Sequence, residues 1–106
     1  MTSRRPGLWR KALAAVAAWG AAATALAADP GRGADLYRSH CASCHGAGGR
    51  PVLPGAPDLA HPTALLKPDL VLLASIRAGR GGMPGYAGQL RDREILDLVA
   101  HLRTFR

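Results

Sequence analysis

Five residues constrain this chain more than any others: Cys41-Ala42-Ser43-Cys44-His45, which include both of its cysteines. One turn of helix would place the two thiols on the same side, with the imidazole of His45 beside them. The C-x-x-C-H spacing is typical of c-type haem attachment, in which each thiol adds to a porphyrin vinyl group and the histidine binds the iron. The motif therefore predicts one covalently attached haem c, held by Cys41 and Cys44, with His45 as an axial ligand.

Three other uses of two closely spaced cysteines compete with haem attachment. A dithiol redox site normally lies on a βαβ scaffold, and the chain has no alternating strand pattern. A zinc site needs two further ligands at compact spacing. A structural disulfide is the simplest use of a cysteine pair in an exported protein. We favour haem because the composition of the chain also indicates a core that needs a supplement.

Residues 1–27 predict export. Four basic residues and no acid precede a run from Ala12 to Ala28 that is mostly alanine, and Ala25-Leu26-Ala27 suits cleavage by a signal peptidase. We therefore predict a cleaved secretory signal peptide at 1–27, a periplasmic location and a mature domain at 28–106. The alternative is a retained membrane anchor, because a run of this length lies at the short end of what spans a bilayer.

The composition of residues 28–106 argues against one class of function and indicates a small core. Without residues 1–27 the chain keeps ten basic and seven acidic residues, so its net charge falls from +7 to +3 and nucleic-acid binding loses its main support. Only 21 of the remaining 79 side chains are large and apolar, and domains this short rarely bury enough surface to be stable unaided. A bound cofactor would supply the missing apolar contacts.

The pattern before residue 69 predicts one short helix and one long loop. The helix covers 33–40, follows Asp29-Pro30-Gly31 and leads directly into the cysteines. Residues 46–68 contain four glycines and five prolines, which no regular element tolerates for long. Such a loop is unusually long for a small domain, unless the chain wraps around an object of its own.

The pattern after residue 68 predicts two further helices and an all-α fold. One helix begins at Pro68-Asp69 and ends at Gly79, with Leu70, Leu73 and Ile76 on one face. Residues 80–86 are irregular. The last helix begins at Asp92, which can cap it, and carries an apolar stripe made of Ile95, Leu98, Val99, Leu102 and Phe105.

Four stretches together resemble the small bacterial class I cytochromes c: Gly33-Ala34-Asp35-Leu36-Tyr37, the C-x-x-C-H turn, Gly82-Met83-Pro84 and residues 95–102. The resemblance implies the cytochrome c fold, with about three to four helices and long loops wrapped around one covalently bound haem. It implies a carrier of single electrons in which His45 and Met83 ligate the iron from opposite faces. It also implies that Gly33 and Tyr37 contact the last helix, where His101 occupies a position that is commonly aromatic.

Met83 has support of its own as the second iron ligand. It is the one methionine left after removal of the signal peptide, and it lies between Gly82 and Pro84 rather than on a helix face, where a core methionine would fit better. Three histidines are rival ligands: His40, His61 and His101. Of these, His61 is the most serious alternative.

Two further sets of residues are candidates around the haem. Pro57 lies in a stretch that resembles the family's Gly-Pro-x-Leu loop, whose proline carbonyl accepts the Nδ1–H bond of the proximal histidine. Arg77 and Arg80 flank the approach to Met83 and are candidates for pairing with the haem propionates, with Arg50 as a lesser rival.

These residues predict an electron carrier rather than an enzyme, because an iron with two protein ligands changes oxidation state without binding a substrate. The expected partners are redox proteins: a donor dehydrogenase or reductase and an acceptor oxidase or reductase. Since the net charge is small, docking should use an apolar surface near Ala42, Val52, Pro84 and Tyr86. The alternatives are a haem subunit of a dehydrogenase or reductase complex, a haem protein with an open distal site (a peroxidase or gas sensor), and an exported thiol carrier.

Overall fold

The structure, a computed structural model, describes residues 27–105. The signal peptide predicted at 1–27 lies outside these residues apart from Ala27, and so does the alternative of a membrane anchor at Ala12–Ala28 apart from its last two residues. Among the described helices, none is both long enough and apolar enough to cross a membrane.

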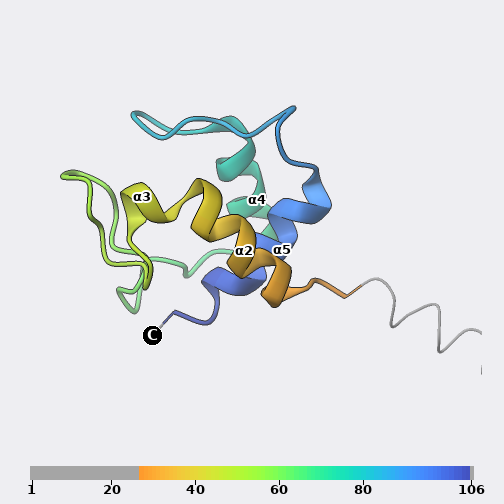
Figure 1. Ribbon diagram of the computed structural model, residues 1–106, viewed down its shortest axis with the longest axis horizontal. Coiled ribbons are helices and arrows are strands. Elements are labelled where there is room, and N and C mark those ends of the chain that lie inside the picture. The colour runs from red at the N-terminus through yellow and green to blue at the C-terminus, as the bar shows by residue number, and fades with distance from the viewer. Residues whose placement is uncertain (1–26, 106) are drawn as a thin grey trace, which may run out of the picture.

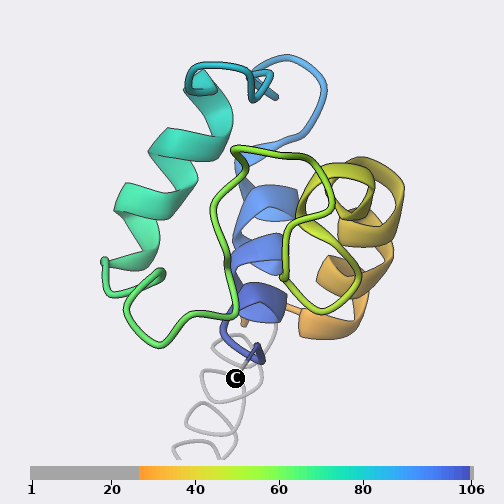
Figure 2. The same cartoon turned by 90° about the vertical axis from the view of Figure 1, so that its left-hand side faces the viewer.

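The described part of the chain forms four helices, and its sole β-type pairing is an isolated bridge between Arg80 and Met83 (Figure 1). The helices are α2 (Pro30–His40), α3 (Ala42–His45), α4 (Asp69–Ala78) and α5 (Asp92–Leu102). Helix α5 lies between α2 and α4, and the loop after α3 runs across this arrangement (Figure 2). The all-α prediction, its helix number and its long loops are confirmed.

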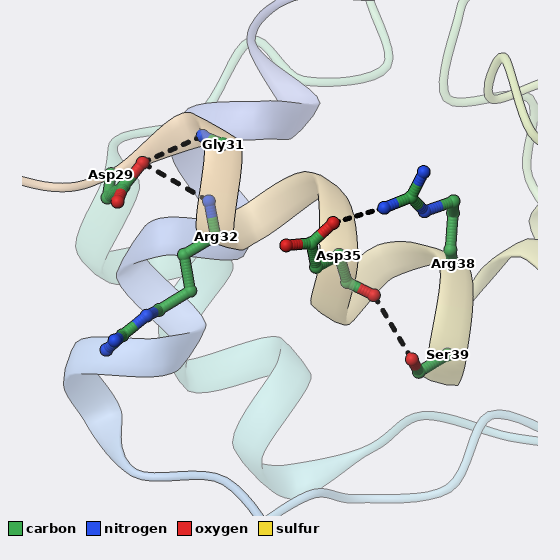
Figure 3. A network of polar contacts seen from close by, with 6 residues as sticks. All are labelled: Asp29, Gly31, Arg32, Asp35, Arg38 and Ser39. Carbon is green, nitrogen blue, oxygen red and sulfur yellow. Dashed lines mark hydrogen bonds and ion pairs between the residues drawn. The ribbon is translucent and has the colours of Figure 1, made fainter.

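Helix α2 begins at Pro30, three residues earlier than predicted, because Asp29 caps it. The Asp29 carboxylate accepts hydrogen bonds from the backbone N–H groups of Gly31 at 2.9 Å and Arg32 at 3.2 Å (Figure 3). Pro30 suits the first helical position because its fixed φ is helical and its missing N–H would have no partner there. The exposed side of α2 carries an ion pair between Asp35 and Arg38.

Helices α2 and α5 cross at Gly33, where the backbones are in contact. A Cβ atom at Gly33 would lie 1.9 Å from the backbone oxygen of Asp97. Tyr37, one turn later, is 1 % exposed, and its ring centroid lies 5.2 Å from that of His101. The contacts expected of Gly33 and Tyr37 are therefore confirmed, and the imidazole of His101 takes the place of the usual aromatic ring.

Helix α5 supplies most of the core. Its predicted stripe is confirmed for Ile95, Leu98, Val99 and Leu102, which are all buried, whereas Phe105 lies beyond the end of the helix and is half-buried. Ile95, Leu98 and Leu102 pack with Tyr37, Tyr86 and Leu90. The prediction that Asp92 caps the helix is wrong: Arg91 is the N-cap, and its backbone N–H donates to Glu94 Oε1 at 3.0 Å. Glu94, the third residue of the helix, thus accepts a hydrogen bond at the end where Asp92 was expected to act as the cap.

Helix α4 has the predicted bounds, but its buried face differs from the prediction. Leu72 is buried, whereas Leu70 is 71 % exposed. The helix packs against α5 through the side that carries Leu72, and Leu73 and Ile76 reach the core only in part. Leu70 therefore faces outward from the protein core.

Candidate haem site

The two cysteines lie on one helical turn, as predicted. Helix α2 ends at His40, Cys41 adopts a non-helical φ of −120°, and α3 continues as a single turn. The backbone N–H groups of Cys44 and His45 both donate to the Cys41 oxygen, at 3.2 and 2.9 Å. Both thiols are free and half-buried. The turn therefore holds two unpaired sulfur atoms close together.

The electrostatics of Cys41 do not favour it as the attacking thiol of a dithiol redox centre. Burial raises the pKa of the Cys41 thiol to about 11, and the nearby charge of Cys44 adds to this shift. A thiol that attacks disulfides has a lowered pKa, because the thiolate is the nucleophile. Within residues 27–105, no three His, Cys, Asp or Glu side chains gather as a metal site would require, so zinc also gains no support.

His45 lies where Pro57 can orient it. Its Nδ1 atom is 3.4 Å from the backbone oxygen of Pro57. The loop that carries Pro57 returns to α3, because the backbone N–H groups of Val52 and Leu53 donate to the Cys44 oxygen at 2.9 and 3.1 Å. A proton on Nδ1 directed at this oxygen would leave Nε2 free to bind a metal. The contact between His45 and Pro57 that the sequence predicts is present.

Gly46 allows the loop after His45 to turn back. Its φ is +79°, and a Cβ atom here would lie 1.9 Å from the Arg50 oxygen. Only glycine combines this left-handed backbone with such a close approach. The turn at Gly46 and the bonds of Val52 and Leu53 to the Cys44 oxygen therefore hold the loop that carries Pro57 next to His45.

Met83 lies on a tightly folded loop at the end of α4. Two hydrogen bonds join Arg80 and Met83, at 3.1 and 3.0 Å, and the backbone N–H groups of Tyr86 and Ala87 donate to the last turn of α4. Gly79 and Gly85 permit this return, since a Cβ atom on Gly85 would lie 2.7 Å from two backbone oxygens of α4. We call residues 80–86 the Met83 loop. Met83 is half-buried and packs against the same core cluster as Cys41.

The residues present fit a haem. Two free thiols, an imidazole and a thioether are the donor set that a c-type haem with His and Met ligation requires. Five large apolar side chains on the loop and on α4 are 46 to 75 % exposed: Val52, Leu53, Leu66, Leu70 and Val71. A large apolar cofactor would give them a surface to cover.

The structure also contains a cavity of about 420 Å³ between residues 59–66 and the end of α5. Leu59, Leu65, Leu102 and Phe105 supply its apolar lining. The cavity is open to solvent, and none of the four donor residues (Cys41, Cys44, His45 and Met83) contributes to its lining.

The three rival histidines have other surroundings. The ring of His40 contacts Tyr86, His61 Nδ1 lies 2.9 Å from the hydroxyl of Thr63, and His101 packs between Tyr37 and Phe105. Each ring therefore has a structural contact of its own. The candidates for the propionates remain exposed, with Arg77 paired to Asp92 at 3.3 Å.

The structure corrects one residue that was predicted for the docking surface, and it adds one residue that holds the long loop and that the sequence did not indicate. Tyr86 is 8 % exposed and belongs to the core, so it is wrong as a docking residue, whereas Val52 and Pro84 are exposed. A tyrosine within a glycine-rich loop gives no sequence signal of burial. Arg103 was missed: it donates to the backbone oxygens of Leu65 and Lys67 and ties the loop to α5.

Comparison with known proteins agrees with this site. Residues 28–102 match the family model described as cytochrome c oxidase, cbb3-type, subunit III. The chain is 31 % identical to cytochrome c6 of Thermosynechococcus vestitus over 81 residues, which cover 74 % of this chain and 71 % of the relative. It is 33 % identical to cytochrome c6 of Synechocystis sp., with coverage of 74 % and 68 %, and 32 % identical to that of Nostoc sp., with 74 % and 72 %.

Proposed function

The chain belongs to the monohaem class I cytochromes c and is an electron carrier similar to cytochrome c6, and we propose that it works in the periplasm with His45 and Met83 as the two axial ligands of its haem iron. The observation that carries this proposal is the placement of four donors. Cys41, Cys44 and His45 share one turn, and Met83 lies on a hydrogen-bonded loop and packs against the same core as Cys41.

The chain's own residues would do four things in this function. Cys41 and Cys44 would hold the haem covalently, so that it stays in place in both oxidation states. Pro57 would fix the ring of His45 through the Nδ1 contact. Met83 would fill the remaining axial position and exclude other ligands. When bound, the haem supplies an iron that takes up and returns one electron.

Residues 1–27 support the periplasmic location. Their basic start, alanine-rich middle and Ala-Leu-Ala end are typical of a secretory signal peptide. The expected partners are redox proteins, which would meet a surface that carries little net charge once this segment is removed.

Replacement of Met83 tests the ligand assignment. Met83→Ala should open the sixth position, so that the reduced protein binds carbon monoxide, and should lower the reduction potential, because methionine ligation favours reduced iron. Visible absorption with and without carbon monoxide measures the first effect, and a redox titration measures the second. Gly82→Ala is the matched control, since a Cβ atom there would have no neighbour within 4 Å. If Met83→Ala keeps the wild-type spectrum and potential, another group is the ligand.

The family match also favours a second candidate function, a haem subunit of a larger oxidase. The matched family is described as subunit III of an oxidase, over residues 28–102. The native source would separate the two functions by fractionation. A free carrier should elute as a single small haem protein, whereas a subunit should remain with a membrane complex after washing with salt.

A further inference from the structure

Two buried tyrosines hold the cysteine-containing turn by its two ends. The Tyr86 hydroxyl donates to the backbone oxygen of His40 at 2.9 Å, and the Tyr37 hydroxyl donates to that of Gly46 at 2.5 Å. His40 and Gly46 directly precede and follow residues 41–45, which we call the attachment segment. Tyr37 and Tyr86 are 1 % and 8 % exposed.

The two carbonyl groups need these partners because both stand at helix ends. His40 is the last residue of α2, and Gly46 caps α3 with a φ of +79°. The final carbonyl groups of a helix have no partner within the helix, and a buried polar group without a hydrogen bond is costly. Within residues 27–105 no backbone N–H group donates to the His40 oxygen, so the Tyr86 hydroxyl is its hydrogen-bond donor, whereas the Gly46 oxygen accepts from the Gly49 N–H at 3.2 Å as well as from Tyr37.

The two tyrosines come from different parts of the molecule. Tyr37 lies in α2 at the crossing with α5, where its ring contacts those of His101 and Phe105 at centroid distances of 5.2 Å. Tyr86 ends the Met83 loop, and its backbone N–H donates to the Ile76 oxygen of α4 at 3.1 Å. Through its hydroxyl, Tyr86 therefore joins the Met83 side of the site to the cysteine side.

We propose that Tyr86 is a positioning residue that couples the Met83 loop to the attachment segment, while Tyr37 anchors the other end of that segment to the helix crossing. This inference rests on the proposed ligation by His45 and Met83. Loss of the Tyr86 hydroxyl should let Met83 leave the iron more readily. Loss of the Tyr37 hydroxyl should loosen the turn after His45 and leave the Met83 loop in place.

The experiment compares the haem-loaded wild type with Tyr86→Phe and Tyr37→Phe, which keep the ring and remove the hydroxyl alone. Ser75→Ala is the control, because it removes a hydroxyl that donates to a backbone oxygen within α4, at 3.1 Å. Imidazole binding to the oxidised protein reports how easily Met83 is displaced. Amide hydrogen exchange reports which backbone segment has loosened.

Tyr86→Phe should tighten imidazole binding about two- to tenfold, the range expected when one net hydrogen bond is lost. It should also speed exchange at the amides of Met83 and Tyr86. Tyr37→Phe should speed exchange at His45 and Gly46, with imidazole binding changed by less than about twofold. Ser75→Ala should match the wild type in both measurements.

The coupling is overturned if Tyr86→Phe binds imidazole as the wild type does, or if both tyrosine variants tighten binding equally. Faster exchange in Tyr86→Phe without tighter imidazole binding also overturns it. Two other measurements test the proposed function itself. A wild type without covalent haem, or a Met83→Ala protein whose sixth position stays closed to carbon monoxide, refutes the ligation before the tyrosine variants are compared.

Discussion

Gly33 sets the distance between the two helices that frame the site. Its missing side chain lets the backbone of α5 approach α2, and a Cβ atom would meet the Asp97 oxygen at 1.9 Å and its carbonyl carbon at 2.5 Å. Backbone atoms cannot move aside as the end of a side chain can. The sequence identified this residue through its resemblance to the class I cytochromes c, in which a small residue on the first helix permits a close crossing.

Gly33→Ala should lower the free energy of unfolding by at least about 2 kcal/mol, because the helices must separate to admit the methyl group. Denaturant titration of the haem-loaded protein measures this loss. Gly48→Ala is the matched control, since a Cβ atom at Gly48 would have no neighbour within 4 Å. If both substitutions change the free energy of unfolding equally, helix propensity or loop entropy explains the effect at Gly33, and the close approach of the helices does not.

His101 makes the same crossing sensitive to pH. Burial lowers the pKa of His101 first, and the positive charge of Arg38 on α2 lowers it further. The rings of Tyr37 and Phe105 pack against His101, and Tyr37 stays protonated because burial raises its pKa to about 12. The folded state therefore favours neutral His101.

Because the folded pKa lies below that of about 6.5 in the unfolded chain, the unfolded state binds more protons as the pH falls. The stabilising contribution of neutral His101 is thus present above pH 6.5 and is lost as the pH falls toward the folded pKa. His101→Phe should remove this part of the acid sensitivity, measured by denaturant titration at pH 7.5 and pH 5. His61→Gln, an exposed control, should keep it. An unchanged pH dependence in His101→Phe would contradict the assignment.

At the scale of elements, the loop before α4 depends on one guanidinium group. Arg103, directly after α5, donates to the backbone oxygens of Leu65 and Lys67 and to Asp69 Oδ1, from Nη2 at 2.8 Å and from Nε at 3.1 Å. The bonds join the end of the long loop and the first residue of α4 to α5. These are four hydrogen bonds from the three nitrogen atoms of a planar guanidinium, whereas a lysine ammonium has three N–H groups on a single nitrogen and cannot form them all.

Arg103→Ala should lower the free energy of unfolding by about 1 kcal/mol, a value reduced by the partial exposure of Arg103 and Asp69. Arg103→Lys should recover little of this loss. Arg38→Ala is the control, because its ion pair with Asp35 lies in solvent and should contribute less than about 0.5 kcal/mol. Thermal or denaturant unfolding measures all three variants. Full recovery in Arg103→Lys would show that charge alone holds the loop.

The existence of the helices was predictable from local patterns, whereas their starts were predicted less well. Pro68 and Gly79 bound α4 and the stripe of α5 marks its buried face, but the cap at Asp29 starts α2 three residues before the predicted position, and Arg91 rather than Asp92 caps α5. The buried face of α4 was not predictable, since its apolar residues run nearly all round the helix and only the position of α5 selects Leu72. The bonds of Tyr86 and Arg103 join residues 46 and 38 positions apart in the sequence, which no local pattern encodes.

At the scale of the whole molecule, the apolar core contains few buried residues for the length of the folded chain. Within residues 27–105, one cluster of six buried residues joins α2 to α5 and to the loop before α5, while five large apolar residues are exposed on the loops and on α4. The sequence predicted this shortage from its count of apolar residues and predicted the haem that would complete the core. The local spacing of Cys41, Cys44 and His45 was sufficient for that prediction, because attachment is the chemistry of five consecutive residues.

The central claim is that this chain holds one covalent haem and carries one electron at a time. An equilibrium redox titration of the purified protein, followed by its visible absorption, tests it most directly. We predict sharp c-type bands in the reduced protein that follow a one-electron curve, with about 59 mV for each tenfold change in the ratio of the two states. A purified protein without haem bands would contradict the claim. A two-electron step of about 30 mV per tenfold change, the slope of a dithiol and its disulfide, would also contradict it.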